Sequence, residues 1–415
     1  MKILQINKFH YLRGGAERHY LELSELLKSH GHEVIHFSMN DSRNEFSKYG
    51  KYFAKQVNLE KFSLVNIFKI FYNFDAQKKL DSLLEAERPD IVHMHNIYHQ
   101  LSPAIINTIK KHNIPMVMTL HDYKIICPNY QLFSQGKICN SCIGQKYYNC
   151  LLKKCAKNSY KKSLLAMLEA YLHNVFLKTY EKVDLFITPS DYLRNTCIKF
   201  GVNSNKIQTL NNFTNLGNIN NQRDFSNKHD KSYYLYFGRI SEEKGIDVLI
   251  DAFSDHKSSL IIVGTGPDYK KYSEIIESRN ITNIKLVGPK YGDSLKNIIN
   301  NATAVIVPSI WPENMPLTIL EAMALKKPII VTNIGGIKEI IEHGVNGFLF
   351  KLGDVNDLKF KIMELSNYNL KEIGENAYLK AKSFNKQDYY NSIAGIYSKL
   401  IELKKQEYAK KNSSF

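Results

Sequence analysis

The sequence predicts an α/β protein with two doubly wound domains, each a parallel sheet covered by helices. Short apolar runs alternate with amphipathic helical segments through residues 1–211. An Asn-rich stretch without periodicity follows at 212–232, and the same alternation then restarts and continues to about residue 385. Two halves of about 200 residues with this alternation are typical of two facing Rossmann-like domains joined by a linker.

The first half contains six candidate strands and a well-defined first helix. The helix spans Glu17–Lys28, with Tyr20, Leu23 and Leu27 at spacings of three and four. We expect a last helix at about 386–408 to complete this domain. The strand candidates are short apolar runs, several of them bounded by Gly, Pro or Asn: Lys2–Asn7, Glu33–Met39, Ile91–Asn96, Met116–His121, Leu185–Pro189 and Ile207–Leu210.

The second half, 233–385, repeats the pattern. Ligands of open parallel sheets bind beyond the carboxyl ends of the strands, so two facing domains predict a site in the cleft between them. The strand candidates are Tyr233–Phe237, Leu260–Val263, Ile284–Val287, Ala304–Val307 and Ile329–Thr332.

Composition narrows the class of protein. The chain has 415 residues and a formal net charge of +16, and residues 101–200 hold 14 Lys and Arg against 5 Asp and Glu. This charge fits anionic partners or simply a solvated surface. We find no recognition helix or aromatic-basic sheet motif for nucleic acid. The first residues are typical of a strand rather than of a signal peptide, and no run of 18 uncharged apolar residues predicts a transmembrane helix. We therefore expect a cytoplasmic chain.

Two segments of the second half follow predicted strands and are rich in glycine. In Gly238-Arg239-Ile240-Ser241-Glu242-Glu243-Lys244, two cations precede a helix, where the helix dipole also favours anions. The alternative is a surface turn with two solvated cations. Gly264-Thr265-Gly266 allows close approach of a nucleotide, although such a sequence is more often a tight turn.

A third segment runs from Pro308 to Met323. Pro316 suits the first turn of a helix, which leaves the amides of Leu317 and Thr318 facing an anion. Glu321 lies in a helix whose other residues are mostly apolar, and a ribose diol would satisfy its carboxylate. Glu313 lies in the preceding loop, closer to a reacting sugar. The alternative is one capping and one surface glutamate.

Together these segments resemble the retaining glycosyltransferases of family 4, which have the GT-B fold. The resemblance rests on Glu313-x7-Glu321, Gly238-Arg239-x4-Lys244 and the Gly-Thr-Gly-Pro turn at 264. It extends over nearly the whole chain through 332–339, 344–348, Gly14-Gly15-Ala16-Glu17-Arg18, Gly31-His32-Glu33-Val34 and His121-Asp122. No single motif is specific, but the combination is.

The resemblance implies roles for these residues. Arg239 and Lys244 would hold the donor diphosphate, Glu321 the ribose, and Glu313 the hydroxyls of the donor sugar, although a nucleophile role for Glu313 is also conceivable. His121 matches a histidine near the reacting carbon; without the resemblance it would read as a packed core histidine. The remaining donor contacts would come from Gly14, Gly15, Gly238, Gly264, Gly266 and the backbone of Asn314, Met315, Pro316 and Leu317.

The implied activity is retaining transfer of a hexosyl-type sugar from a nucleotide-diphosphate sugar, with UDP or GDP, to a glycan or lipid-linked glycan acceptor in bacterial surface polysaccharide synthesis. Cations and helix N-termini would stabilise the leaving diphosphate, so no cofactor or catalytic metal is expected. Alternatives are a nucleotide-sugar 2-epimerase of the same fold and a non-catalytic glycan-binding module.

Five of the six cysteines cluster between residues 127 and 155. Cys139-x2-Cys142-x7-Cys150-x4-Cys155 offers four thiolates for a structural zinc ion, with Cys127 as a substitute ligand. Redox-labile thiols and disulfides remain as alternatives.

A basic segment follows the cysteines. A strongly apolar helical run follows five lysines: Lys153, Lys154, Lys157, Lys161 and Lys162. Residues 62–79 combine lysines and apolar residues in a similar way. Such helices lie on anionic membranes, which would place the chain peripherally on the inner face of the plasma membrane. The alternative is a core helix with a basic rim.

Overall fold

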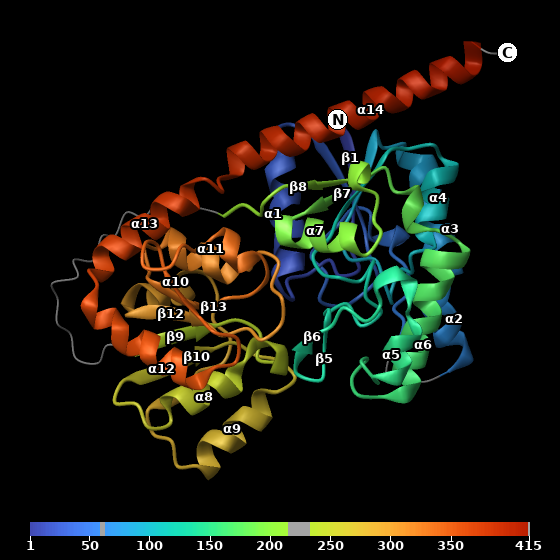
Figure 1. Ribbon diagram of the computed structural model, residues 1–415. Helices are drawn as coiled ribbons and strands as arrows, with labels where there is room; N and C mark the ends of the chain where they lie inside the picture. Colours follow the sequence, from blue (N-terminus) through green and yellow to red (C-terminus); the bar gives the residue numbers. More distant parts are fainter. Residues whose placement is uncertain (59–62, 215–232, 414–415) are drawn as a thin grey trace. The chain divides into compact units, whose positions relative to one another are not determined.

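The computed structural model describes residues 1–58, 63–214 and 233–413, and its chain divides into two compact units. Unit 1 comprises Met1–Gln135, Cys139–Asn211 and Gln387–Phe415, and unit 2 comprises Gly136–Ile138 and Asn212–Lys386. Most of the predicted linker, 215–232, lies outside the described residues. In Figure 1 each unit shows a central sheet with helices around it.

Unit 1 contains a six-stranded parallel sheet in the order β2-β1-β3-β4-β7-β8. Every one of these strands was predicted, with ends one or two residues too long. The strands are β1 Lys2–Ile6, β2 Glu33–Phe37, β3 Ile91–Met94, β4 Met116–Thr119, β7 Leu185–Thr188 and β8 Ile207–Thr209. Outside the two main sheets, the short strands β5 Phe133–Ser134 and β6 Lys137–Ile138 form a hairpin.

The helices of unit 1 connect these strands, and the first begins directly after Gly14. A π-helical turn at Tyr171–Phe176 follows α6. The helices are α1 Gly15–Ser29, α2 Leu64–Phe71, α3 Phe74–Glu87, α4 Ile105–Lys111, α5 Tyr148–Leu152, α6 Tyr160–Ala170, α7 Asp191–Lys199 and the long α14 Lys386–Ser413.

Helix α14 packs against unit 1. Tyr389, Ile393 and Tyr397 of this helix are buried, and the Tyr397 hydroxyl lies 2.5 Å from Nδ1 of His93 on β3. The ring of Tyr390 stacks on His30 at the end of α1, with ring centroids 3.6 Å apart. The apolar side of the C-terminal helix is thus part of the unit 1 core.

Unit 2 contains a second six-stranded parallel sheet in the order β11-β10-β9-β12-β13-β14. Five strands were predicted; β14 was not. The strands are β9 Tyr233–Phe237, β10 Ser259–Val263, β11 Ile284–Leu286, β12 Ala304–Val307, β13 Ile329–Thr332 and β14 Phe348–Phe350. The helices are α8 Ile246–Phe253, α9 Tyr269–Ser278, α10 Gly292–Asn301, α11 Leu317–Ala324, α12 Val355–Glu364 and α13 Leu370–Lys382.

Alternate side chains of β9 enter two separate cores of unit 2, as a sheet covered on both faces requires. Tyr234 and Tyr236 pack with α8, α9 and α12, whereas Leu235 and Phe237 pack with α10, α11 and α13. Figure 1 shows α8 and α12 on one side of this sheet and α10 and α11 on the other. The two layers fix the strand ends from which the site loops begin.

Unit 1 buries an unusual number of histidines around its sheet. His10 follows β1 and its Nδ1 lies 2.8 Å from the Tyr20 hydroxyl, while the His36 ring on β2 lies 4.6 Å from the His10 ring. Burial lowers the pKa of His10 to about 4 and the pKa values of His36 and His93 to about 3. These rings are therefore neutral in the folded protein near neutral pH.

The buried histidines predict a loss of stability in mild acid. Between the unfolded pKa near 6.5 and the lowered folded values, only the unfolded chain binds protons, so the free energy of unfolding falls as pH falls. Moving from pH 7.5 to 5.5 should cost roughly 1 kcal/mol for each such histidine. Denaturant unfolding at both pH values measures this, and His36→Asn should lessen the difference. Equal stability at both pH values would contradict the prediction.

Candidate functional site

In unit 2, the loops that follow β9 and β12 meet through an ion pair whose carboxylate is buried. Lys244 ends a short 3-10 turn, Glu242–Lys244, just before α8, and its Nζ lies 2.5 Å from Oε1 of Glu313. The Ser309 hydroxyl donates to the same oxygen at 2.6 Å. The Glu313 side chain is buried and Lys244 is partly exposed, with its ammonium 5.3 Å from the Trp311 ring centroid.

This pairing leaves hydrogen-bonding capacity for a ligand. An ammonium has three N–H donors, and Glu313 takes one of them. Both of the hydrogen bonds described above fall on Oε1, so Oε2 of Glu313 can accept from a sugar hydroxyl. Lys244 and Glu313 were predicted separately, as phosphate and sugar ligands; their direct contact was not predicted.

The chain then turns from Glu313 into α11. Glu313 accepts a backbone hydrogen bond from Gly336 at 2.7 Å, and the Asn212 amide donates to the carbonyl of Met315 at 3.0 Å. Pro316 was predicted in the first turn of a helix and instead occupies the N-cap position of α11, whose first residue is Leu317. The amides of Leu317 and Thr318 therefore precede the first intrahelical bond, from Ile319 to the Pro316 carbonyl. Asn314 and Met315 are buried.

Arg239 and Glu321, the other two side chains predicted to bind the donor, also lie in unit 2. The Arg239 side chain is exposed, and its carbonyl accepts from the Tyr236 hydroxyl at 2.6 Å. Glu321 is partly buried on α11, four residues after Leu317. Of these residues, Lys244 and Glu313 are in direct contact.

The glycines after β9 and β10 allow two loops to touch. A Cβ on Gly264 would lie 1.8 Å from the carbonyl oxygen of Gly238, and one on Gly266 would lie 2.0 Å from that of Ile240. Backbone packing alone therefore requires glycine at 264 and 266, whatever they bind. Their role in nucleotide binding stays a prediction.

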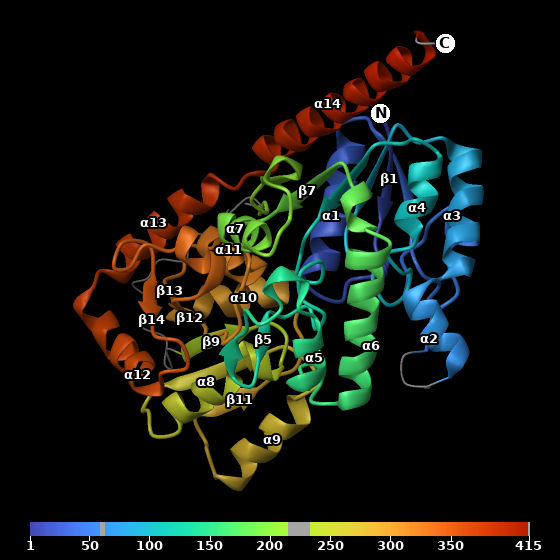
Figure 2. The same ribbon diagram turned by 45° about the vertical axis from the view of Figure 1, so that its right-hand side comes forward.

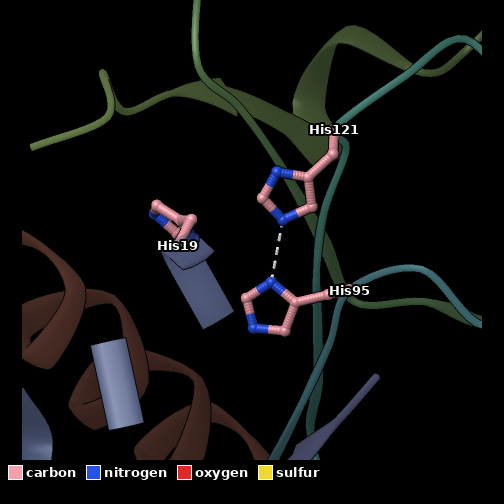
Figure 3. Close-up of side chains that lie close together, drawn as sticks. All are labelled: His19, His95 and His121. Carbon is pink, nitrogen blue, oxygen red and sulfur yellow. Dashed lines mark hydrogen bonds between the residues drawn. The ribbon is translucent and has the colours of Figure 1, made fainter. Parts of the chain in front are cut away.

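In unit 1, His121 follows β4 and belongs to a group of three histidines. Figure 3 shows the rings of His121 and His95 edge to edge, with His19 of α1 beside them. Nε2 of His121 lies 2.9 Å from Nδ1 of His95, and Nε2 of His95 lies 2.8 Å from Oε1 of Gln5 on β1. Sequence reasoning missed His95, Gln5 and His19, which carry no spacing that marks them.

The Gln5 oxygen fixes the tautomers of this chain of hydrogen bonds. An amide oxygen only accepts, so His95 donates through Nε2 and accepts at Nδ1 from His121. His121 then carries its proton on Nε2, and Nδ1 is its basic nitrogen. Burial lowers the pKa of His95 and His121 well below the usual value, so both are neutral.

The same three histidines also match a metal site in ligand type. Among the described residues, they alone form a group of three or more such side chains whose ligand atoms all lie within 4.8 Å of one another. A metal would have to replace the proton shared by His95 and His121. The four predicted zinc ligands, Cys139, Cys142, Cys150 and Cys155, are not in such a preformed group.

Asp122, next to His121, is held firmly. Its Oδ2 accepts from the Tyr98 hydroxyl, and its Oδ1 accepts from the Lys124 backbone at 2.9 Å. The Lys8 ammonium lies 3.8 Å from the Tyr98 ring centroid, and burial lowers the pKa of Lys8 to about 8.

Gly14 and Gly15 form the exposed start of α1, one turn before His19.

Comparison with known proteins identifies the class. The profile described as Glycosyltransferase Family 4 matches residues 13–218, and that described as Glycosyl transferases group 1 matches residues 218–380. The chain belongs to the family 4, group 1 glycosyltransferases and has the GT-B fold.

Individual relatives agree with this assignment. An uncharacterised glycosyltransferase of Methanocaldococcus jannaschii is 26% identical over 97% of this chain and 99% of its own length. The alpha-monoglucosyldiacylglycerol synthase of Acholeplasma laidlawii is 24% identical over 96% and 97% of the two chains. The amylovoran biosynthesis glycosyltransferase AmsK of Erwinia amylovora is 28% identical over 41% and 46%.

A solved structure shares the fold. Anabaena HepE, crystallised with UDP-glucose, aligns with a TM-score of 0.68 at 20% identity and covers 96% of this chain and 100% of its own. This likeness concerns the fold alone.

Proposed function

We propose that this glycosyltransferase moves a sugar from a nucleotide-diphosphate donor to a glycan or lipid-linked glycan, with retention at the anomeric carbon, in bacterial surface polysaccharide synthesis. The observation that carries the proposal is the Lys244–Glu313 pair at the start of α11. A cation with spare donors, a carboxylate with a spare acceptor and unsatisfied helix amides together match a sugar diphosphate. The amylovoran relative supports the polysaccharide context, and the UDP-glucose complex of HepE supports the donor class.

Each residue has a part in this proposal. Arg239, Lys244 and the α11 amides stabilise the charge that develops on the departing diphosphate, so no metal is required there. Glu321 binds the ribose and Oε2 of Glu313 binds hydroxyls of the donor sugar. Nδ1 of neutral His121 accepts a hydrogen bond from a sugar hydroxyl.

A panel of UDP-, GDP- and ADP-sugars, with and without oligosaccharide or polyprenyl-linked glycan acceptors, tests this proposal. We expect nucleotide release that requires an acceptor, persists in chelator and yields a product with the donor's anomeric configuration. Glu321→Ala should raise the donor KM roughly 10- to 100-fold, because hydrogen bonds to a carboxylate are lost. Glu372→Ala, which removes an exposed glutamate of α13, is the control.

Other results of the panel would select the alternatives. Release of nucleotide together with a free 2-epimeric sugar identifies an epimerase. Donor binding with no turnover against any acceptor identifies a binding module. Loss of activity in chelator, restored by one divalent metal, contradicts the metal-independent mechanism.

We further propose that an apolar and basic face of unit 1 rests on anionic membrane. No helix in the described part of the chain is long and apolar enough to cross a bilayer. The apolar run of the basic segment is not simply core, because Leu164, Leu168 and Phe176 are 40%, 43% and 76% exposed. Helix α2 lies beside α6 (Figure 2), and His173 bonds the Phe71 carbonyl of α2 at 2.8 Å. Phe68 of α2 is 68% exposed.

Vesicle co-sedimentation tests the membrane proposal. The chain should bind vesicles that contain anionic phospholipid, less so at high salt, and should bind purely zwitterionic vesicles weakly. Leu168→Glu/Phe176→Glu should abolish binding, whereas the matched control Leu379→Glu/Leu403→Glu, at exposed leucines of α13 and α14, should not. Equal binding by both double variants would refute the assignment of this face.

A further inference from the structure

Five of the six cysteines surround one small cavity in unit 1. The cavity has a volume of about 10 Å³, roughly the room of one small atom or water. The sulfurs of Cys150 and Cys155 are 2.7 Å apart. The five cysteines that line it are Cys127, Cys139, Cys142, Cys150 and Cys155. This distance lies between the S–S length of a disulfide and the separation of two sulfurs on one zinc ion, so the loop must shift for either to form.

The chain around this cavity has little regular structure. Between residues 127 and 158 it forms only the β5–β6 hairpin, a 3-10 turn at 143–145 and the five-residue helix α5. Seven of the fourteen non-glycine residues with positive φ in the described chain fall in this segment: Tyr130, Leu132, Gln135, Gln145, Lys154, Lys157 and Asn158. Left-handed backbone at such residues persists only where the surroundings hold it, and here Asn129 donates to the carbonyls of Phe133 and Cys155.

The hydrogen bond of Cys127 distinguishes it from the other four cysteines. The Cys127 thiol donates to Oδ1 of Asn129 at 2.9 Å, so its proton has a local acceptor. Lys153, by contrast, places its ammonium 3.8 Å from the Cys139 sulfur. The same ammonium lies 2.5 Å from the Ser141 hydroxyl, so a positive charge stands beside the four cysteines that Asn129 does not bind. The exposed Lys146 and Lys157 lie in the same segment.

We propose that Cys139, Cys142, Cys150 and Cys155 bind one Zn²⁺ as four thiolates, releasing four protons. The resulting centre carries two negative charges, and Lys153 offsets part of this charge. Zinc at about 2.3 Å from each sulfur would set Cys150 and Cys155 about 3.8 Å apart, so the loop must tighten and rearrange as the ion binds. A disulfide between these two residues would leave Cys139 and Cys142 beside the cavity unused.

The zinc content of the full-length protein tests this proposal, and it does not depend on glycosyl transfer. Protein purified under reducing conditions should contain about one zinc per chain by elemental analysis, released by a mercurial thiol reagent. Cys142→Ser should lose most of the zinc. Cys127→Ser and Cys197→Ser, which remove buried cysteines outside the proposed ligand set, should keep it.

A spectroscopic measurement guards against variants that fail to fold. The wild-type chain, prepared with Co²⁺ in place of Zn²⁺, should show the d–d and sulfur charge-transfer bands of a tetrahedral thiolate site. Wild-type protein with little zinc and no cobalt bands, or a peptide map that shows a Cys150–Cys155 disulfide in freshly prepared protein, would overturn the proposal. Loss of zinc in Cys127→Ser alone would reassign the ligand set and likewise contradict it.

Discussion

The buried carboxylate of Glu313 is the constraint on which the proposed donor site of unit 2 depends. A carboxylate out of water must be paired and hydrogen-bonded, and Glu313 meets this need with Lys244 and Ser309. Its carbonyl also accepts from Gly336, and a Cβ on Gly335 would come within 2.2 Å of that oxygen. One residue thus holds together the loops that follow β9, β12 and β13.

A different polar arrangement organises the corresponding strand ends of unit 1. Gln5 on β1 and the two histidines that follow β3 and β4 form a line of hydrogen bonds in which every ring is neutral. Because the Gln5 oxygen can only accept, it determines which ring nitrogen carries the proton, first in His95 and then in His121. Unit 2 therefore places an ion pair at its strand ends, whereas unit 1 places neutral histidines there.

The sequence predicted the architecture because buried parallel strands are short apolar runs, and eleven of the twelve main-sheet strands have that form. Strand β14 was missed because Phe348–Phe350 is only three residues long and follows Gly344-Val345-Asn346-Gly347. The candidate site was predicted as residue types at strand ends. Its pairings were not, since Lys244 and Glu313 are 69 residues apart and His95 and His121 are 26 apart. Periodicity reports which side chains are buried, not which ones meet.

Calorimetric binding of the nucleoside diphosphate product tests the central claim most directly. If Lys244 holds both Glu313 and the diphosphate, Lys244→Met should weaken binding at least about tenfold, consistent with a lost charge-assisted hydrogen bond. Glu313→Gln should leave the affinity for the nucleotide alone nearly unchanged, because Glu313 is assigned to the sugar. Binding by Lys244→Met as tight as wild type, in a protein that remains folded, would contradict the account.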